Sequence, residues 1–562
     1  MPQDAYTLRH IAKELDLALS GGKINKIVQP SRDEIDMIVY ANGKTHKLVL
    51  NTNASFARAI LSKAERTAPV TAPNFCMLLR KHLSGATLLS VQQIGFERIL
   101  AFSFDCLGEF SRANRILYAE IMGKYSNLVL TENGIITGAL KISSLQENFK
   151  RVLFPGVKYQ PPEAQDKVDP QDVSALSKLL SAYSGGDFAD FLFNHVSGLA
   201  YPTCLQLSEL LSFGNGAEKN SQTAAEKIHE FIFSDSISPC VERTDGEAKE
   251  FYARKECEEK YPSVNAAADA FYTDKETRRE FSEKKRKLES AVLARRKKEE
   301  KKLGLITDRE KECESIEKNR IFGELIIANI YAIAKGATVL EAINYYSENA
   351  ETVKIPLDKT LTPSQNAQKY YKKYNKQKRT LTAIAPQKKE TLAELDYLES
   401  LLFSIRKAEN LLDFSETEEE LKEFGLLREE NTAKKKQKQI LPFRAFSFEG
   451  FRIFAGRNNV QNDRLLREAA PDDIWLHTQK YHSSHVLIRT EGKTVPDSVL
   501  LFAAEICAFF SDAKIADKVP VDFCERRYVK KPPKSKAGFV IYTDFKTLLV
   551  TPQRHSDKEI LS

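Results

Sequence analysis

The stretch Pro471-Asp-Asp-Ile-Trp-Leu-His-Thr-Gln-Lys-Tyr-His-Ser-Ser-His-Val-Leu-Ile-Arg489 holds the only tryptophan and three of the nine histidines of the chain. Two short apolar runs, 474–476 and 486–488, flank a polar loop, and this pattern predicts a strand, a loop and a second strand. An aromatic ring, neutral imidazoles and cations in one short span suit unpaired RNA bases and phosphates. A buried tryptophan with structural histidines is the competing interpretation. The candidate RNA contacts are Trp475, His477, Lys480, His482, His485 and Arg489.

Length and composition indicate a multidomain protein. A chain of 562 residues is too long for one hydrophobic core and predicts three or four domains. Its hydrophobic content of 42%, charged content of 29% and net charge of +7 are typical of a soluble protein and permit nucleic-acid binding without requiring it. The N-terminus lacks the basic run and apolar core of a signal peptide, and no apolar run reaches membrane-spanning length. We therefore expect a cytoplasmic protein that does not contact a membrane.

The eight cysteines include no Cys-x-x-Cys pair, so we expect neither a zinc ribbon nor a dithiol redox site, but reduced, buried thiols. The three histidines of the opening stretch lack a nearby carboxylate or cysteine at zinc spacing. The chain also has no phosphate-binding Gly-x-x-x-x-Gly-Lys-[Ser/Thr] loop, no His-Glu-x-x-His and no Gly-x-Ser-x-Gly. The residues alone therefore predict an RNA-binding scaffold with no cofactor, no metal and no catalytic site.

Residues 1–170 predict a compact α+β domain. Asp4 can cap a helix that ends at Gly21-Gly22, and Asn74 can cap a second helix. Strands are expected at 23–29, 34–40, 45–51 and from 87 to about 140. The dipeptides Asn42-Gly43 and Asn133-Gly134 predict tight hairpins between strands.

Residues 171–268 predict a helical domain. The turn Val196-Ser-Gly-Leu199 resembles the hairpin of a helix-hairpin-helix unit, which offers backbone N–H groups to phosphates. A plain helical linker explains the segment nearly as well.

Residues 269–434 predict a long antiparallel coiled-coil arm with a small middle domain. A charged helix with the apolar stripe Phe281, Leu288 and Val292 is followed about 80 residues later by a seam of Leu395, Leu398, Leu402, Ile405 and Leu412. At about 1.5 Å rise per residue, an arm of about 40 residues reaches about 60 Å, a length useful for a large partner. Near the tip, tyrosines interleave with lysines over 369–374, which favours phosphate binding or a helix that packs its tyrosines.

Residues 435–562 predict a mixed α/β domain after the basic linker Lys434–Lys438. Strands are expected at 446–454 and 540–550, with a buried helix at 496–513. The loop 525–536 carries one acid against six cations and two prolines, and it is the strongest candidate for phosphate contacts. Its proposed RNA contacts are Arg526, Arg527, Lys530, Lys531 and Lys534.

Five dispersed segments together resemble the NFACT family of ribosome quality control factors, whose members were formerly called fibronectin-binding proteins. These segments are Phe75–Ala86, Glu120–Asn127, Leu361–Gln368, Asp473–Thr478 and Val529–Lys534, and the resemblance covers essentially the whole chain in the same order. The resemblance implies a glycosylase-like NFACT-N domain, a helix-hairpin-helix domain, a coiled-coil arm with a middle domain, and an NFACT-R RNA-binding domain.

The same resemblance implies a function without catalysis by the protein itself. Bacterial members bind a large ribosomal subunit that still carries peptidyl-tRNA, and they recruit tRNA, usually alanyl-tRNA. The stalled nascent chain then receives a C-terminal tail without mRNA, and this tail marks it for degradation. Peptidyl transfer belongs to the rRNA, and a small RNA-binding companion protein is a further partner.

The resemblance also implies tRNA-binding residues at Glu97, Arg98, Lys124 and Asn127. The family has an Asp-Arg pair where this chain has Glu97-Arg98, which keeps the charge and adds a methylene. An ordinary surface ion pair is the alternative. A second departure is Ser483-Ser484-His485 where relatives commonly have Gly-Ser-His, and this loop would then be less free to adopt a positive φ.

Three other functions are compatible with parts of the sequence. A DNA-repair glycosylase could use the amine of Pro2 as a nucleophile, but Gln3 stands where those enzymes have Glu, and their zinc finger has no counterpart. A fibronectin-binding surface adhesin would need an export signal. A family member that binds stalled subunits without making tails is the third.

Overall fold

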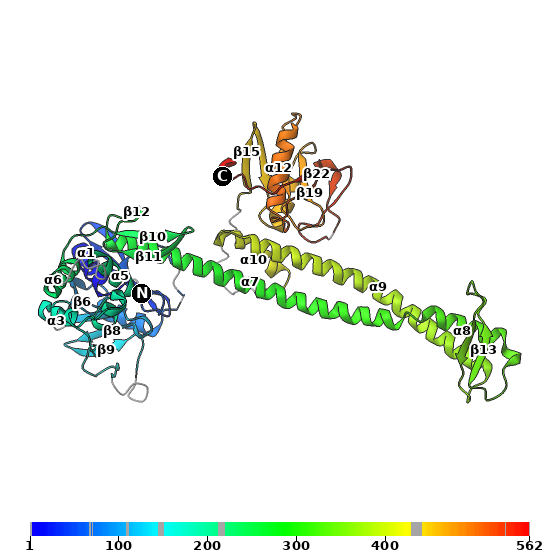
Figure 1. Cartoon of the computed structure of the whole chain (residues 1–562), viewed down its shortest axis with the longest axis horizontal. Coiled ribbons are helices and arrows are strands. Elements are labelled where there is room, and N and C mark those ends of the chain that lie inside the picture. The colour runs from blue at the N-terminus through cyan, green and yellow to red at the C-terminus, as the bar shows by residue number, and fades with distance from the viewer. Residues whose placement is uncertain are drawn as a thin grey trace. The chain divides into compact units, whose positions relative to one another are not determined.

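The computed structural model describes residues 3–66, 69, 71–107, 112–143, 151–163, 165–211, 220–428, 441–533 and 535–560. Contacts divide the chain into two units, Met1–Arg278 and Arg279–Ser562, and helix α7 (Val264–Glu312) contributes residues to both. Figure 1 labels some of the elements of each unit. Within the described ranges, no helix has the length and apolar character needed to cross a membrane. The linker Lys434–Lys438, Lys534 and the Met1-Pro2 amine lie outside these ranges.

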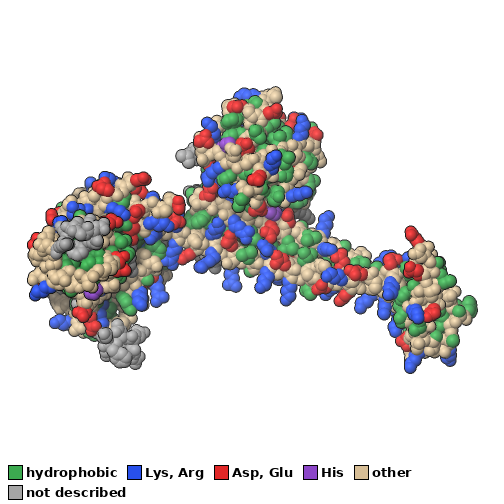
Figure 2. Space-filling model, viewed as in Figure 1, with side chains coloured by type: hydrophobic (Ala, Val, Ile, Leu, Met, Phe, Trp, Pro, Cys, Tyr) green, Lys and Arg blue, Asp and Glu red, His purple; other side chains and the backbone are tan. Residues whose placement is uncertain are grey.

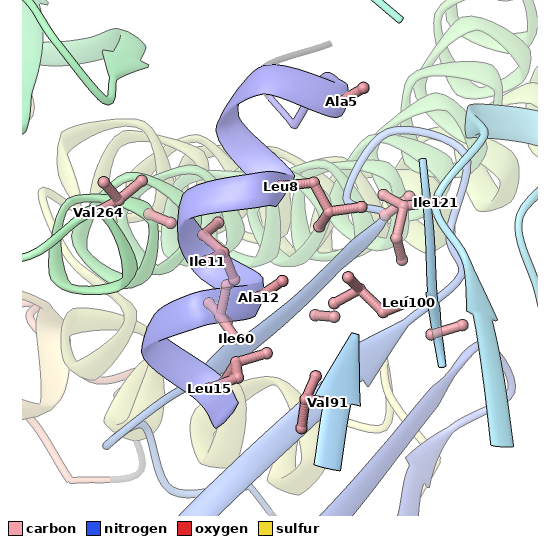
Figure 3. Packing of buried hydrophobic residues seen from close by; sticks show 14 of the residues in the cluster. Ala5, Leu8, Ile11, Ala12, Leu15, Ile60, Val91, Leu100, Ile121 and Val264 are labelled. Carbon is pink, nitrogen blue, oxygen red and sulfur yellow. The ribbon is translucent and has the colours of Figure 1, made fainter. Parts of the chain in front are cut away.

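Helix α1 (Ala5–Leu19) begins and ends where the sequence predicts. The carboxylate of Asp4 accepts a hydrogen bond from the N–H of Thr7 at 2.8 Å, and Gly21 follows the helix at φ +78°. Figure 3 shows the apolar face of α1 packed among side chains from the sheet and from the start of α7. This face is the centre of the first unit, and its buried residues include Leu8, Ile11, Ala12, Leu15 and Leu19.

A nine-stranded antiparallel sheet forms the body of the first unit, in the order β4-β3-β2-β1-β5-β6-β7-β8-β9. Both predicted Asn-Gly hairpins are confirmed: Asn42 and Asn133 each have φ +51°, and a glycine with positive φ follows each of them. The strands are β1 (Lys23–Ser31), β2 (Glu34–Ala41), β3 (Lys44–Asn51), β4 (Arg58–Leu61), β5 (Thr87–Gln93), β6 (Ile99–Leu107), β7 (Arg112–Glu120), β8 (Asn127–Glu132) and β9 (Ile135–Ala139).

Helix α2 (Asn74–Leu83) lies where the sequence predicts it, but its expected cap is wrong. Pro73 is the N-cap and makes no side-chain hydrogen bond to the helix, while Asn74 is already the first helical residue. Proline suits this position because the first N–H groups of a helix lack partners within the helix.

The region expected to be wholly helical contains both helices and a small sheet. The helices are α3 (Val173–Ser181), α4 (Phe188–His195), α5 (Tyr201–Leu211) and α6 (Ser221–Phe233). The prediction missed the sheet of β10 (Cys240–Thr244), β11 (Glu247–Tyr252) and β12 (Glu259–Lys260). The turn Asp245-Gly246, with positive φ at both residues, is the hairpin signal that would have revealed it.

Two backbone N–H groups in the turn between α4 and α5 donate hydrogen bonds to other parts of the protein. Ser197 donates its N–H to the carbonyl of Val168 at 2.8 Å, and Ala200 donates its N–H to the carboxylate of Asp4 at 3.0 Å. A Cβ on Gly198 would lie 2.8 Å from that of Ala5. This turn therefore ties α5 to the start of α1, and the N–H groups of Ser197 and Ala200 are already used within the fold.

The expectation of reduced thiols throughout is also wrong. Cys240 and Cys257 form a disulfide that links β10 to the loop after β11. The other six cysteines are free and buried, as expected.

The arm of the second unit is an antiparallel pair of helices, α7 and α9 (Pro363–Lys407). Arg295 of α7 pairs with Glu394 of α9 at 2.8 Å, and Glu310, further along α7, pairs with Lys388, nearer the start of α9, at 2.5 Å, so the two helices run in opposite directions. Figure 2 shows basic side chains interspersed with acidic ones along the arm. The seam residues Leu398, Leu402 and Ile405 are buried as predicted, but α9 ends at Lys407 and Leu412 is exposed outside the seam.

The distal end of the arm carries helix α8 (Ile316–Ala328) and a hairpin of β13 (Val339–Ile343) and β14 (Thr352–Pro356). Helix α9 then begins with a capping box in which Thr362 and Gln365 exchange hydrogen bonds, with Pro363 as the first helical residue. The hairpin was not predicted, because its alternation of apolar residues is short and weak.

The C-terminal domain is built on a seven-stranded antiparallel sheet, in the order β22-β19-β17-β18-β16-β15-β23. Two predicted strands are each divided: Glu449-Gly450 turns 446–454 into a hairpin, and residues 543–545 interrupt 540–550. Helix α12 packs on one face of the sheet. The elements are β15 (Arg444–Phe448), β16 (Phe451–Ala455), α11 (Asn459–Glu468), β17 (Ile474–Thr478), β18 (Val486–Arg489), α12 (Asp497–Phe509), β19 (Val519–Glu525), β20 (Val529–Lys530), β21 (Ile541–Tyr542), β22 (Lys546–Val550) and β23 (Glu559–Ile560).

Helix α10 (Phe414–Glu423) joins the base of the arm to this domain through buried carboxylates. Glu420 accepts hydrogen bonds from the hydroxyl of Tyr397 at 2.7 Å and from the amide of Asn459 at 3.4 Å. Its second oxygen has no partner within the described residues. Burial raises the pKa of Glu420 to about 7.

This pKa predicts a specific loss of stability with rising pH. The pKa of Glu420 is near 4.5 when the chain is unfolded and about 7 when it is folded. The folded state therefore binds more protons between these values, and its stability falls by about 3 kcal/mol as the pH rises through that window. Because glutamine stays neutral, Glu420→Gln should flatten this part of the pH profile, measured by urea unfolding at about pH 5 and about pH 8.

The matched control is Glu468→Gln, which changes an exposed acid at the end of α11. Its profile should follow that of the unmodified protein. A profile for Glu420→Gln identical to that of the control would contradict the assignment.

Candidate nucleic-acid interface

The tryptophan of the opening stretch belongs to the core. Trp475 on β17 is 0% exposed and packs with Leu465, Leu466 and Leu487. The prediction that its ring is an open platform for RNA bases is therefore wrong, because the second face of the sheet is covered by α11. The competing interpretation, a buried tryptophan, is correct.

Two of the three histidines share this buried environment. The rings of His477 and His485 lie 5.7 and 5.4 Å from that of Trp475, measured between centroids. Burial lowers the pKa of His477 to about 4 and that of His485 well below its usual value, so both imidazoles are neutral at pH 7. His485 is 1% exposed, and it is not the surface contact that the sequence suggested.

The loop between β17 and β18 presents different side chains to solvent. Lys480 is exposed, has φ +61° and makes no ion pair within the described part of the chain. His482 lies 3.8 Å from Asp396 of α9. Ser483 has no positive φ, so its replacement of a glycine leaves this loop unstrained.

Arg489 is a structural residue in this domain. Its guanidinium donates to the carboxylate of Asp473 at 2.9 Å, and Asp473 is buried and also accepts from the N–H of Thr490 at 3.0 Å. A cation paired with a buried carboxylate is not available for phosphate without a large cost. The prediction of an RNA contact at Arg489 is therefore wrong.

The basic loop divides into structural and open cations. Arg526 donates to the carbonyls of Leu466 and Val529, both at 2.8 Å, and Lys531 pairs with Asp463. By contrast, Lys530 is exposed and makes no ion pair among the described residues, and Arg527 is half exposed beside Glu525. Lys530 and Arg527 are thus the cations of this loop best placed to meet phosphate, while Lys534 lies outside the described residues.

In the first unit, Glu97 and Arg98 occupy the tight turn between β5 and β6. The carbonyl of Glu97 accepts from the side chain of Gln93 at 2.8 Å, and the carbonyl of Arg98 accepts from the N–H of Ile121 at 2.8 Å. The backbone of the turn is therefore fixed, and both side chains are partly exposed. Burial raises the pKa of the Glu97 carboxyl, and the charge of Arg98 opposes that shift.

The bond from Ile121 brings a second predicted segment against this turn. Lys124 is exposed, and its ammonium lies 4.9 Å from the ring centre of Tyr125, which is 72% exposed. Tyr125 was not selected from the sequence, although its place beside a lysine in a recognised motif is a usable signal. An exposed ring next to cations is a surface on which a base can stack.

Asn127 does not contribute to this surface. It is 4% exposed, donates to the carbonyl of Lys141 at 2.7 Å and accepts from the N–H groups of Leu128 and Lys141, both at 2.9 Å. Its amide bridges the starts of β8 and of the segment after β9. The prediction of a tRNA contact at Asn127 is wrong.

The tyrosines near the tip of the arm pack inward. Tyr370 donates its hydroxyl to the carbonyl of Pro356 at 2.7 Å, and the ring of Tyr371 covers Gly323. On the same helix, α9, the lysines Lys372, Lys373 and Lys376 are exposed. This stretch is a packed helix with a basic outer face.

Two sequence models of known protein domains match this chain. Residues 4–440 match the sequence model of the NFACT N-terminal and middle domains, and residues 441–542 match that of the NFACT protein RNA-binding domain. The chain belongs to the NFACT family. These two matches together extend over nearly the whole NFACT chain described here.

Two bacterial relatives are similar to this chain along nearly its whole length. This NFACT chain is 34% identical to the Rqc2 homolog RqcH of Bacillus subtilis over 97% of each chain, and 32% identical to that of Streptococcus suis over 100% of each. A solved structure, the N-terminal part of the fibronectin/fibrinogen-binding protein from Streptococcus suis, is 27% identical, covers 48% of this chain and 99% of its own, and has a TM-score of 0.42. The family and its RNA-binding domain support a role in ribosome quality control.

Proposed function

We propose that this protein binds the large ribosomal subunit that carries a stalled peptidyl-tRNA and recruits tRNA, usually alanyl-tRNA, to it. The nascent chain then grows by a C-terminal tail without mRNA, and the tail marks it for degradation. The observation that carries this proposal is the similarity to Rqc2 homologs along nearly the whole chain, together with an RNA-binding domain model at residues 441–542.

The four parts expected from the sequence have separate tasks in this proposal. The first part, 1–170, holds tRNA at the edge formed by Arg98, Lys124 and Tyr125. The helical part, 171–268, supports it. The arm, 269–434, reaches along the subunit with its basic outer face, and the last part, 435–562, contacts rRNA through Lys480, Arg527 and Lys530.

In this proposal the protein positions the tRNA, and the rRNA of the subunit carries out peptidyl transfer. Holding two reactants in a productive geometry can lower a barrier by about 7–11 kcal/mol without any group of the protein taking part in bond making. A planar guanidinium such as that of Arg98 suits this task because it binds a phosphate or a base edge through two parallel hydrogen bonds. A small RNA-binding companion protein could share the rRNA contact.

Replacing Arg98 should reduce tail synthesis without reducing binding to the large ribosomal subunit. Arg98→Ala removes a side chain at the tRNA edge while the backbone of its turn stays bonded to Ile121. We expect C-terminal tails to fall at least about tenfold, because one charge-assisted contact is worth about 1.5–3 kcal/mol. Tails are measured on a stalled reporter by mass spectrometry, and subunit binding by co-sedimentation.

Lys44→Ala, an exposed cation on β3, is the matched control and should leave tails and binding unchanged. Tails of normal length and amount from the Arg98 variant would remove Arg98 from the proposal.

The salt dependence of subunit binding tests the C-terminal cations. Double replacement Arg527→Gln and Lys530→Gln removes two open charges without disturbing Arg526, whose bonds hold the loop. The slope of log K against log salt should become shallower by about 2, since each neutralised phosphate contributes roughly 0.9. Arg452→Gln with Lys493→Gln, a pair of exposed cations in the same domain that flank Glu491, is the control. Equal slopes for both double variants would place the rRNA contact elsewhere.

A further inference from the structure

A pocket of about 680 Å³ lies within the second unit, between α9 and the loops of the C-terminal domain. Ala393, Tyr397 and Lys407 line it from α9, and the β17–β18 loop and residues 535–540 line it from the domain. A cavity of this size is large enough for a small organic ligand. Of the residues that line it, only Lys480 is also used in the contacts proposed above.

The wall contributed by the domain offers neutral hydrogen-bonding groups. His477 and His485 line the pocket as uncharged imidazoles, beside Asn462 and Ser483. The Nδ1 atom of His485 is buried and has no hydrogen-bond partner within the described residues. Burying a polar atom without a partner is unfavourable, and such an atom in a pocket wall calls for a ligand or a functional reason.

The wall contributed by α9 carries the buried amine of Lys407 together with the carboxylates of Glu390, Glu394 and Asp396. The ammonium of Lys407 contacts the hydroxyl of Ser484 and lies 4.6 Å from the ring centre of Phe510, whose ring is also 4.4 Å from the guanidinium of Arg444. No carboxylate lies within 4.0 Å of the Lys407 ammonium among the described residues. Burial and the charge of Arg444 lower the pKa of Lys407. A ligand oxygen could accept a hydrogen bond from this amine.

The mouth of the pocket carries two open aromatic rings and a cation. Tyr481 is 45% exposed and Phe539 is 48% exposed, and both line the opening. Lys480 precedes Tyr481, and its left-handed backbone is a conformation that is unfavourable for a non-glycine residue. Flat, exposed rings of this kind are surfaces on which nucleobases stack.

We propose that this pocket binds one unpaired ribonucleotide, with its base against His485 and Asn462, an oxygen on Lys407 and its phosphate beside Lys480. The combination of neutral donors and acceptors, aromatic faces, the Lys407 amine and the exposed cation of Lys480 fits a base and its phosphate better than it fits a purely anionic or purely apolar ligand. A flipped-out nucleotide of an RNA loop and a free mononucleotide share this chemistry. The RNA source rests on the proposed function, and the free nucleotide does not.

The single tryptophan makes ligand entry measurable in the full-length protein. Trp475 lies behind His477 and His485, so a base that contacts these rings should change its fluorescence. The four ribonucleoside monophosphates form one arm of the titration, and an unstructured oligoribonucleotide forms the other. Free tryptophan amide corrects for absorption by the nucleotides. We expect a saturable change in at least one arm.

Two variants report on the pocket itself. Ala393→Phe fills it from an exposed position on α9, and Lys480→Glu reverses the charge at its mouth. Each should weaken nucleotide binding at least about tenfold, or about 1.4 kcal/mol. Lys546→Glu, an exposed lysine on β22 outside the pocket, should leave binding unchanged. Circular dichroism confirms that each variant is folded.

The outcomes separate this inference from the proposed function. Binding in the oligoribonucleotide arm identifies RNA as the source, and binding in the monophosphate arm alone identifies a free nucleotide; both support the pocket. No saturable change in either arm, or equal affinity of Ala393→Phe and the unmodified protein, overturns it. If ribosomal subunits still co-sediment with the protein in that case, only the pocket has failed. If they do not, the proposed function has failed independently.

Discussion

The carboxylates of α10 hold the C-terminal domain on the base of the arm. Asp413 pairs with Arg457 at 3.1 Å, Glu416 accepts from Asn458 and Gln461 at 2.9 and 2.8 Å, and Glu420 joins Tyr397 of α9 to Asn459 of α11. Buried pairs of this kind contribute little net stability compared with apolar packing, but removing one partner is costly. Their role here is to fix which surface of the domain faces the arm.

The same pairing decides which cations remain for RNA. Arg457, Arg489 and Arg526 are each committed to an oxygen of the protein itself. Lys480 and Lys530 are exposed and have no such partner among the residues described. A net charge of +7 therefore understates how selective the basic surface is, because position and pairing matter more than the sum. Binding through a few open cations and exposed rings agrees with a factor that must hold RNA and also release it.

Local signals predicted much of the fold, while tertiary burial limited the prediction of the interface. The cap at Asp4, the Asn-Gly hairpins and the apolar seam of α9 act within a few residues, so the sequence reveals them directly. The burial of Trp475 depends on α11, and the role of Arg489 depends on Asp473 across two strands. The amino-acid composition close to Trp475 or Arg489 does not reveal that α11 or Asp473 is its partner. The Asp245-Gly246 and Glu449-Gly450 turns carried a local signal that strong helical or strand patterns around them concealed.

The central claim is that cations and aromatic rings at both ends of this chain hold ribosomal RNA and tRNA. The most direct measurement is to purify the full-length protein from cells after ultraviolet cross-linking and to sequence the attached RNA. The account predicts enrichment of large-subunit rRNA together with one dominant tRNA, and cross-linked peptides that contain Arg98 or Lys530. Recovery of no RNA, or of messenger RNA without large-subunit rRNA, would contradict it.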